Sequence, residues 1–585
     1  MTRPSEKRVY VLGLTSYGHD SAAALLHDGR LVCAVEEERF ARKKHTGEFP
    51  ARAIHACLAA AGIRADQVDA VGFYWNPWAQ VIRRGMHLVR HFPDSLGLLS
   101  LKLNAFSGRW SIPGQIRSFL GKPGLPVHMV EHHLAHAASA FHVSPFDEAA
   151  ILSLDGMGEW CTTLYAHGKG NEIRKLKEVY FPNTLGDLYT AVCVYLGFMP
   201  CSGEGKVMGL AAYGDPNPWY EPMREMVRLK GEGDYTLDTR NFLFHVKGET
   251  EWYSPRMVKV FGPPRPPEAP LEKRHEDIAA ALQRVLEECA MELVKYLHRA
   301  TGSSRLCLAG GVALNSVMNG RILREGPFHE VSVQPAANDA GASLGAALYV
   351  YHCIHGGPRG YVLDSAQLGP LHAPEEIKSA IAASGLPARE MPDADLVPRV
   401  AQALSEGKIV AWFRGRAEFG PRALGARSIL ADPRRAEMKD ILNHRVKHRE
   451  PFRPFAPAVT LERCADYFER GTPSPFMLLV YEVLKHRRGE IPAITHVDGT
   501  ARVQTVDKRV DPGFHSLVDE FGRITGTPVI LNTSFNVRGE PIVNSPTDAI
   551  ACFAGTEMDA LAMGNWWIEK PAGFRPVAPG PKALD

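Results

Sequence analysis

The chain has 585 residues, 45% of them hydrophobic, and is therefore long enough for two or more domains with sizeable cores. Its formal net charge of +2 at pH 7 gives no electrostatic reason to expect a nucleic acid or a membrane surface as a partner. Ten scattered cysteines without a CxxC pair, the lack of a transmembrane-length apolar run and the lack of a signal-peptide core argue against structural zinc, disulfides and secretion, so we expect a cytoplasmic protein.

Three strands are predicted at the start of the chain. The runs Val9–Thr15, Ser21–Leu26 and Leu31–Val35 have strand-like composition, and the turn His27–Arg30 is short enough to join the last two as a hairpin. A strand, a polar turn at Ser16–Asp20 and then a hairpin is how sugar kinases and actin-like ATPases begin. This opening favours an α/β fold.

The stretch Glu131–Phe141 carries two histidines at helical spacing. Residues four apart share one face of a helix, so the imidazoles of His132 and His136 can point at one ion. With the later carboxylates of Asp155 and Asp339, they form a set that suits iron(II), manganese or zinc better than calcium. An isolated HxxxH pair is more often two partly buried histidines than a metal site. The prediction therefore depends on the residues that accompany the pair.

Both aspartates come shortly after a predicted strand. Asp155 follows Ile151–Leu154, and Asp339 comes six residues after Val331–Val333. Open α/β sheets bind ligands beyond the carboxyl ends of their strands, so we expect both carboxylates at a ligand site.

A third strand, Leu306–Leu308, leads into paired glycines and then a helix. Gly310 and Gly311 allow the backbone to approach a phosphate, and the helix that follows offers its amino terminus. Such turns also serve packing alone. Because the metal set is expected nearby, we favour a site for a nucleotide and an ion.

The helical periodicity of the sequence is lost between residues 351 and 370. Before this stretch, Asp277–Leu297 keeps helical spacing and is predicted as a core helix. Residues 351–370 are rich in glycine and lack periodicity, and a new helix is predicted near Ala373. We therefore expect one domain over residues 1–360 and a second over residues 372–585.

The second half is rich in arginine beyond a predicted strand, Lys408–Phe413. Guanidinium groups bind phosphate through two hydrogen bonds, so an anion site is expected here, although many of the arginines will lie on the surface. A further strand, Thr527–Leu531, leads into Asn532 and Ser534, which add amide and hydroxyl groups.

Several long motifs in fixed order resemble the NodU/CmcH family of carbamoyltransferases, and they cover nearly the whole chain. They are HDSAAALLHDGRLVCAVEEERFARKKH, HHLAHAASAF, SLDGMGE, EGKVMGLAAYG, LAGGVALN, NDAGASLGAA, FGPRALGARSIL, FRPFAP and LNTSFNVRGEPIV. The resemblance implies an α/β protein with an ASKHA-type (actin-like ATPase) amino-terminal domain for carbamoyl transfer and a YrdC-like carboxy-terminal domain that forms carbamoyl-adenylate. The substrates implied are ATP, carbamoyl phosphate and a small-molecule acceptor with a hydroxyl or an amine, as in natural-product or antibiotic biosynthesis or on a glycan.

The resemblance also implies roles for individual residues of the first domain. His132, His136, Asp155 and Asp339 would bind the metal, Fe(II) or another divalent ion, with magnesium as a further candidate. Lys44 would contact carbamoyl-adenylate, and His19 and Asp20 would lie near the acceptor. The residues implied to hold the nucleotide are Glu204, Lys206, Gly310, Gly311 and Asn315.

In the second domain the resemblance implies a phosphate site. Its residues would be Arg422, Arg453, Arg502, Arg538, Asn532 and Ser534. The sequence does not identify the acceptor, so aminoglycoside, macrolide, cephem, toxin and glycan acceptors are all compatible with it. We expect the segments 75–121 and 216–270 to select it. The oligomeric state cannot be read either.

Two alternative functions fit parts of the sequence. A hydrogenase-maturation carbamoyltransferase uses the same paired modules, but it would carry an acylphosphatase-like segment and CxxC motifs in front, where this chain is expected to begin with its first strand. A non-catalytic actin-like regulator would keep the phosphate loops, but it gives no role to the arginine-rich half. Pyrophosphate and AMP release that requires carbamoyl phosphate would separate the classes.

Overall fold

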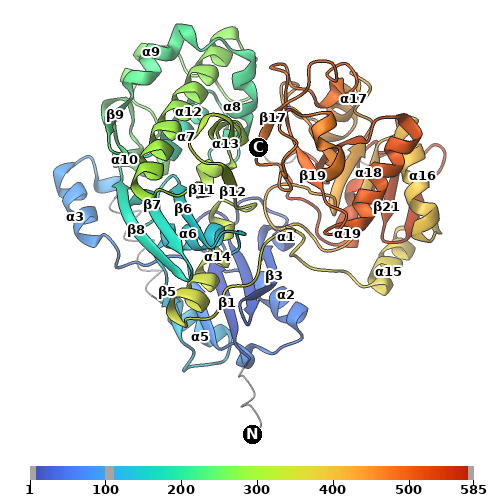
Figure 1. Ribbon diagram of the computed structural model, residues 1–585, viewed down its shortest axis with the longest axis horizontal. Helices are drawn as coiled ribbons and strands as arrows, with labels where there is room; N and C mark the ends of the chain where they lie inside the picture. The colour runs from blue at the N-terminus through green and yellow to red at the C-terminus, as the bar shows by residue number, and fades with distance from the viewer. Residues whose placement is uncertain (1–7, 99–110, 577–585) are drawn as a thin grey trace. The chain divides into compact units, whose positions relative to one another are not determined.

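The computed structural model describes residues 8–98 and 111–576 (Figure 1). The chain divides into two compact units. The first holds the chain up to Glu37 and His45–Leu363, and the second holds Glu38–Lys44 and the chain from Asp364 on. A short segment near the amino terminus therefore packs with the carboxy-terminal unit.

The first unit opens with a five-stranded sheet of order β3-β2-β1-β4-β5. Its strands are β1 (Tyr10–Thr15), β2 (Ala22–His27), β3 (Arg30–Glu36), β4 (Ala70–Phe73) and β5 (Val127–Met129). β2 and β3 are joined by Asp28 and Gly29, both with positive φ, as a two-residue hairpin turn requires. The three predicted strands and their hairpin are confirmed.

A second five-stranded sheet, of order β12-β11-β6-β7-β8, repeats this plan. Its strands are β6 (Glu148–Leu154), β7 (Cys161–Lys169), β8 (Glu172–Tyr180), β11 (Arg305–Ala309) and β12 (Glu330–Val333). In both sheets the first three strands form an antiparallel meander, and the fourth strand pairs in parallel with the first. This duplication is the ASKHA architecture that the resemblance implied.

Two helices fill the space between these sheets. α6 (His132–Phe141) packs on β6, β7 and β11, while α14 (Asp339–Leu348) packs on α6 and on β1 and β2. Their contact is very close, because a Cβ built on Gly345 of α14 would lie 1.7 Å from the carbonyl oxygen of Ala135 in α6. Only glycine fits there, and the close contact brings the amino terminus of α14 to the face of α6.

The predicted core helix is α12 (Lys273–Thr301), which ends at Gly302 in the left-handed conformation. The other helices of this unit are α2 (Ala51–Ala61), α3 (Val81–Arg90), α5 (Ile112–Phe119), α7 (Leu185–Tyr195), α8 (Glu204–Leu210), α9 (Asn217–Glu225), α10 (Phe244–Lys247), α11 (Pro255–Phe261) and α13 (Ser316–Glu325), and β9 (Val227–Gly231) pairs with β10 (Asp234–Leu237). Part of the segment expected to select the acceptor, residues 99–110, lies outside the described residues.

The second unit is built on an eight-stranded mixed sheet of order β13-β22-β21-β14-β15-β20-β16-β19. Its strands are β13 (Ala388–Glu390), β14 (Val410–Phe413), β15 (Arg427–Ala431), β16 (Ala456–Thr460), β19 (Gln504–Val506), β20 (Val529–Ser534), β21 (Ala560–Met563) and β22 (Trp566–Glu569), and β17 (Val480–Glu482) pairs separately with β18 (Thr500–Arg502). The strands predicted at 408–413 and 527–531 correspond to β14 and β20.

Helices complete the α/β class of this unit. They are α1 (Glu38–Ala41), α15 (Pro374–Ser384), α16 (Asp393–Ser405), α17 (Met438–Leu442), α18 (Pro512–Thr525) and α19 (Pro546–Ala554). α16 packs on α18, and Trp412, Phe514 and Phe521 belong to the core between these helices and the sheet. The α/β class is thus confirmed for both parts of the chain.

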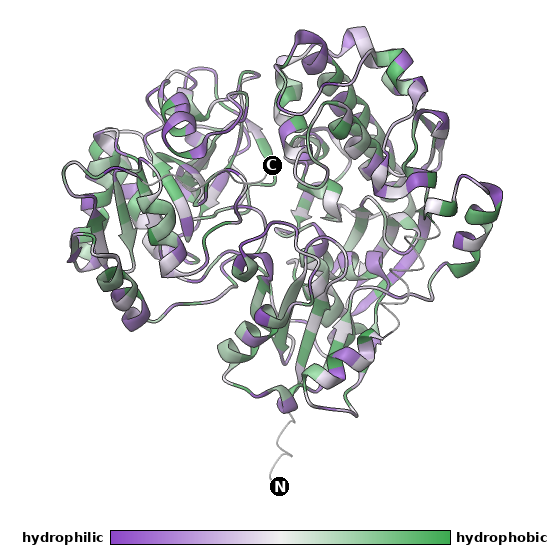
Figure 2. Ribbon diagram, turned by 180° about the vertical axis from the view of Figure 1, so that it is seen from behind, coloured by the Kyte–Doolittle hydropathy of each residue, from purple (hydrophilic) through white to green (hydrophobic). Residues whose placement is uncertain are grey.

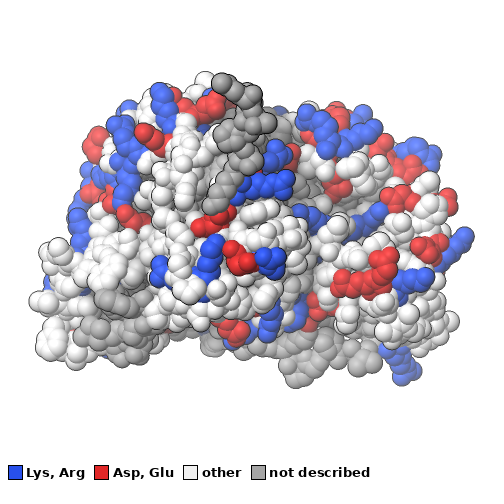
Figure 3. All heavy atoms as spheres, turned by 90° about the horizontal axis from the view of Figure 1, so that it is seen from below, with Lys and Arg blue, Asp and Glu red and all other residues white. Residues whose placement is uncertain are grey.

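Apolar and charged residues are distributed as in an ordinary globular protein. The strands of both units are mainly hydrophobic, whereas hydrophilic residues gather on the outer sides of the helices (Figure 2). On the face drawn in Figure 3, acidic and basic side chains are interspersed, in keeping with the small formal net charge. In the described residues, none of the helices is both long and apolar enough to cross a membrane.

Candidate functional site

Four side chains of the first unit converge where α6, the end of β6 and the start of α14 meet. The Nε2 atoms of His132 and His136 lie 2.8 and 3.0 Å from Oδ2 of Asp155. They lie 3.5 and 3.7 Å from Oδ1 of Asp339. The helix therefore presents both imidazoles on one face, and each carboxylate reaches both of them.

Backbone groups fix the carboxylate of Asp155. Its Oδ1 accepts hydrogen bonds from the amides of Gly156, at 2.9 Å, and of Gly311, at 3.1 Å. This leaves Oδ2 directed at the histidines. A side chain at Gly311 would lie 3.0 Å from Oδ1, so the glycine permits the close approach.

The electrostatics of the cluster follow from burial and mutual hydrogen bonding. Burial alone would lower the pKa of His136, but hydrogen bonds with Asp155 and Asp339 raise it to about 9. For Asp155, burial would raise the pKa, yet the two histidines hold it well below its usual range. The carboxylate of Asp155 is therefore ionised. Its negative charge keeps the imidazole of His136 protonated when no metal ion is bound.

The donor set fits a divalent metal ion. One ligand atom from each of the four residues can be chosen so that all lie within 4.8 Å of one another, and the two Nε2 atoms are 3.0 Å apart. That separation is what two adjacent ligands show around an ion at about 2.1 Å. Two nitrogens and two carboxylate oxygens suit a transition metal such as iron or manganese.

Packing orients the first histidine. The rings of Tyr74 and Trp75 lie 5.3 and 5.6 Å from the ring of His132. Its backbone amide donates to Oε1 of Glu159 at 3.0 Å. Within the described residues its Nδ1 is buried without a hydrogen-bond partner, so ring packing and the helix position the imidazole.

The turn between β1 and β2 forms a second polar group in this unit. Asp20 has a positive φ, and its carboxylate contacts Nδ1 of His45 at 2.7 Å and Nδ1 of His19 at 3.1 Å. Asn338, directly before Asp339, donates to the same carboxylate at 2.8 Å. Burial would raise the pKa of Asp20, but the two histidines depress it, so it is ionised.

The predicted nucleotide residues lie on two neighbouring pieces of the first unit. Gly310 has φ +87°, and a Cβ there would lie 2.1 Å from the carbonyl oxygen of Leu154, so the glycine turn rests on the end of β6. Asn315 caps α13 by accepting from the amide of Met318 at 2.9 Å. Through Gly311, this turn is hydrogen-bonded to Asp155, one of the four predicted metal ligands.

Glu204 and Lys206 belong to α8. The carboxylate of Glu204 accepts from Thr190 Oγ1 at 2.8 Å and from the amide of Cys201 at 3.1 Å, which holds the preceding loop. Lys206 is buried, with Nζ 5.7 Å from the centre of the Phe198 ring.

In the second unit the structure gathers the predicted arginines. Burial and the charge of Arg453 lower the pKa of Arg422 to about 10. Burial, together with Arg422, Arg449 and Arg453, holds the pKa of Arg502 well below its usual range. Two of the arginines share one carboxylate: Nη2 of Arg538 lies 3.9 Å from Oε1 of Glu450, and Nη1 of Arg453 lies 3.7 Å from Oε2.

Arginine side chains this close together repel one another, and a bound anion would reduce that repulsion. The Nε atoms of Arg422 and Arg502 are buried and have no hydrogen-bond partner within the described part of the chain. Buried donors without partners cost about 1–3 kcal/mol each, and more where they are charged. A phosphate group would satisfy the donors and offset the repulsion.

The other two predicted residues of this unit lie beside the arginines on β20. Asn532 is buried and donates to Oε1 of Gln504 at 2.7 Å. Ser534 donates to Oδ1 of Asn536 at 2.7 Å, and its backbone carbonyl accepts from Lys447. Burial and the charge of Arg449 hold the pKa of Lys447 well below its usual range.

Lys44 lies in the second unit, although its sequence neighbours precede β4. The segment is held by Arg39, which donates to the carbonyl of Gly420 at 2.7 Å, and by Arg42, which donates to the carbonyls of Ile542 and Pro541 at 2.7 and 3.0 Å. Lys44 contributes to lowering the pKa of Lys447, so it lies near the arginine cluster.

Some residues of these sites were not among those predicted. Lys447 and Arg449 belong to the arginine-rich half for which an anion site is expected, but they are not among its named phosphate-binding residues, and the sequence does not connect His45 with Asp20. The link between His45 and Asp20 spans 25 residues and needs the folded loop.

Two family models match the chain, and three relatives align with most of its length. Residues 10–348 match the family described as Carbamoyltransferase N-terminus, and residues 401–570 match Carbamoyltransferase C-terminus. The chain is 42% identical to the uncharacterized protein sll1178 of Synechocystis, over 96% of this chain and 97% of that protein. It is 40% identical to nodulation protein NolO of Bradyrhizobium diazoefficiens (76% and 80% covered) and 37% identical to nodulation protein NolNO of Sinorhizobium fredii (95% and 79% covered).

Solved structures show weaker likeness. Component A of (R)-2-hydroxyglutaryl-CoA dehydratase from Acidaminococcus fermentans is 15% identical, with a TM-score of 0.34, over 58% of this chain and 97% of that chain. HypF from T. kodakarensis is 14% identical, with a TM-score of 0.29, over 60% and 48%. Likeness at this level does not bear on what the chain binds.

Proposed function

Because the chain belongs to the carbamoyltransferase family and is a carbamoyltransferase enzyme, we propose that it uses carbamoyl phosphate and ATP to carbamoylate a small molecule. The group would pass through carbamoyl-adenylate to a hydroxyl or an amine of the acceptor. The observation that supports the proposal is that each unit holds one cluster of side chains: two histidines and two aspartates in the first unit, and arginines in the second.

We assign adenylate formation to residues 372–585 together with the Lys44 segment. The balanced reaction is carbamoyl phosphate, ATP and water to carbamoyl-adenylate, pyrophosphate and phosphate. Arg422, Arg453, Arg502 and Arg538 would bind the phosphate oxygens, since fixed guanidinium groups neutralise charge without reorganisation. Lys447, held against Ser534, would add a further positive charge.

We assign transfer to residues 1–360. When bound by His132, His136, Asp155 and Asp339, a divalent ion, for which we propose Fe(II), would supply Lewis-acid stabilisation to the adenylate phosphate. The glycine turn at Gly310 and Gly311 would hold the nucleotide, with Asn315, Glu204 and Lys206 shaping that site.

Transfer also requires a base that removes the proton of the acceptor hydroxyl. Nδ1 of His19 lies 3.1 Å from the ionised carboxylate of Asp20, which favours the tautomer with a free Nε2 once the ring is neutral, as in other His–Asp pairs. Burial would lower the pKa of His19, but the charges of Asp339, Cys201 and Asp20 raise it well above its usual value, so the ring must lose its Nε2 proton before it acts as a base. His19 would accept the proton of the acceptor hydroxyl as the oxygen forms its bond to the carbamoyl carbon and AMP leaves. The products are the carbamate and AMP.

The test is an assay of pyrophosphate and AMP. The proposal expects pyrophosphate release that requires carbamoyl phosphate, and AMP release that also requires an acceptor. A protein that hydrolyses ATP regardless of carbamoyl phosphate, or does not turn ATP over under any of these conditions, contradicts the proposal. The same assay separates transfer from a regulatory nucleotide-binding role.

A further inference from the structure

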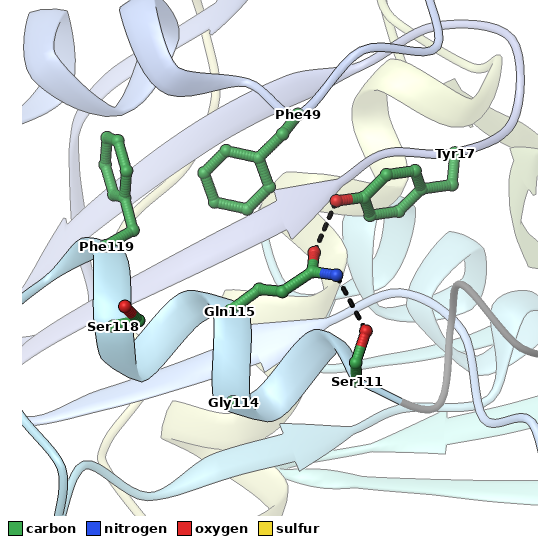
Figure 4. Close-up of a pocket in the computed structure, with 7 residues that line it drawn as sticks. All are labelled: Tyr17, Phe49, Ser111, Gly114, Gln115, Ser118 and Phe119. Carbon is green, nitrogen blue, oxygen red and sulfur yellow. Dashed lines mark hydrogen bonds between the residues drawn. The ribbon is translucent and has the colours of Figure 1, made fainter.

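The first unit contains a pocket of about 640 Å³ next to the β1–β2 turn (Figure 4). Tyr17 and Phe49 line one side, and α5 supplies the other side. The residues of α5 and its start that matter here are Ser111, Gln115, Ser118 and Phe119. The volume lies within the range of roughly 300–1,000 Å³ that small-molecule sites occupy.

The pocket adjoins the proposed transfer site through the backbone. Tyr17 lies two residues before His19 on the same turn, and its amide donates to the carbonyl of Gly47 at 2.9 Å, which ties the turn to the loop carrying Phe49. Between them, a Cβ built on Gly18 would lie 3.5 Å from Oδ2 of Asp339. A ligand seated in the pocket would therefore have one end close to the His19 turn and the predicted metal ligands.

Aromatic rings supply the apolar part of the lining. The rings of Phe49 and Phe119 meet edge to face with centroids 5.1 Å apart, and Tyr17 presents its ring to the same space. Aromatic faces stack on flat apolar surfaces, including the C–H face of a sugar ring. The lining thus suits a ring with one apolar face.

Hydrogen bonds fix the polar part. The hydroxyl of Tyr17 donates to Oε1 of Gln115 at 2.5 Å, and Nε2 of Gln115 donates to Oγ of Ser111 at 2.7 Å (Figure 4). Amides and hydroxyls recognise the hydroxyls of a ligand. No charged side chain is among the residues that line this pocket in the described parts of the chain. The described part of the lining is therefore uncharged.

We propose that this pocket binds the carbamoyl acceptor and that it selects a neutral, hydroxylated ring, such as a glycoside, over polycationic aminoglycosides and acidic sugars. The inference rests on the proposed function and gives that function a substrate class. Stacking on the three aromatic rings would orient the acceptor, and one of its hydroxyls would face His19, which takes the proton while AMP departs.

Saturation-transfer NMR on the full chain tests the inference with three probes. They are p-nitrophenyl β-D-glucopyranoside as the neutral ring, kanamycin as the cation and glucuronate as the anion. The variants are Phe119→Ala, which removes one aromatic wall, and Gln115→Glu, which keeps the shape and adds a negative charge. Phe92→Ala is the matched control, because Phe92 is an exposed phenylalanine outside the pocket.

The neutral glycoside should bind the unaltered chain and Phe92→Ala equally. It should bind Phe119→Ala about three- to tenfold more weakly, the usual worth of one aromatic contact. Gln115→Glu should gain affinity for kanamycin. Unchanged glycoside binding by Phe119→Ala, or stronger binding of kanamycin or glucuronate than of the glycoside by the unaltered chain, would overturn the inference.

A parallel assay separates this inference from the proposed function. Pyrophosphate release dependent on carbamoyl phosphate should be the same in the unaltered chain and in Phe92→Ala, because this change touches neither the arginine cluster nor the pocket. If pyrophosphate release is present but the pocket variants bind the glycoside as tightly as the unaltered chain, only the acceptor assignment fails. If the release is absent from the unaltered chain, the proposed function itself fails.

Discussion

The Nε2 atoms of His132 and His136 lie 3.0 Å apart, one helical turn from each other, on a fully buried face of α6. Both nitrogens also lie within 3.0 Å of Oδ2 of Asp155. One proton cannot make hydrogen bonds between all three of these atoms. A cation in their midst would satisfy both nitrogens and the carboxylate oxygen at once.

Replacing Asp155 by Asn should remove the metal and with it carbamoyl transfer. The amide keeps the shape of the side chain but not its charge, and we expect a loss of metal affinity beyond the roughly 10–100-fold that an outer-shell partner costs. Metal content by mass spectrometry and AMP release with acceptor measure the effect. Asp147→Asn is the control, because Asp147 is exposed just before the same strand. Full metal content in Asp155→Asn would refute the assignment.

Metal affinity should rise with pH. Because hydrogen bonds with Asp155 and Asp339 raise the pKa of His136 to about 9 in the metal-free protein, this imidazole is protonated at pH 7. The metal must displace that proton, so affinity should increase about tenfold per pH unit from pH 7 to 8 and level off above pH 9. Calorimetric titration with Mn²⁺ in buffers of different ionisation enthalpy measures the released proton. Affinity that is independent of pH would contradict this picture.

Gly345→Ala should destabilise the first unit. The added Cβ would meet the carbonyl oxygen of Ala135 at 1.7 Å and force α6 and α14 apart. Overpacking of this kind costs about 1–3 kcal/mol, and separating the helices also moves Asp339 from the histidines. Thermal unfolding and metal content measure both effects. Gly85→Ala in α3, where a Cβ meets no atom within 4 Å, should instead be neutral or stabilise by roughly 0.5–1 kcal/mol. Equal behaviour of the two variants would exclude the packing argument.

Arg502→Lys should impair adenylate formation while metal content stays unchanged. Lysine keeps the positive charge but loses the two parallel hydrogen bonds to phosphate. A hydrogen bond to a charged group is worth about 1.5–3 kcal/mol, so pyrophosphate release should fall roughly 10–100-fold. Arg523→Lys is the control, since Arg523 is exposed on α18 and pairs only with Glu520 in the contacts described here. An Arg502→Lys protein with unaltered pyrophosphate release would remove this residue from the phosphate site.

Local sequence signals predicted much of the fold and of the first site. The i,i+4 spacing of His132 and His136, the short apolar run before Asp155 and the glycine pair after β11 each depend on a few neighbouring residues. Periodicity and turn chemistry act over the same range, which is why the Asp28-Gly29 hairpin and the helix ending at Gly302 could be anticipated.

Contacts between distant residues could not be predicted in the same way. The packing of Lys44 with the second unit depends on Arg39 and Arg42 reaching carbonyls some 380 and 500 residues away in sequence. The contact of Gly345 with Ala135 is likewise invisible in a single sequence, because a helix interior glycine has several explanations. The resemblance supplied residue roles, but the convergence of the arginines required the folded chain.

Anomalous diffraction from crystals grown with Fe(II) and AMP tests the central claim most directly. Data recorded on both sides of the iron edge should show one strong peak about 2.0–2.2 Å from Nε2 of His132, Nε2 of His136 and carboxylate oxygens of Asp155 and Asp339, with the AMP phosphate beside it. A map without a peak among these four side chains, or with the ion bound elsewhere and AMP distant from the glycine turn, would contradict the account.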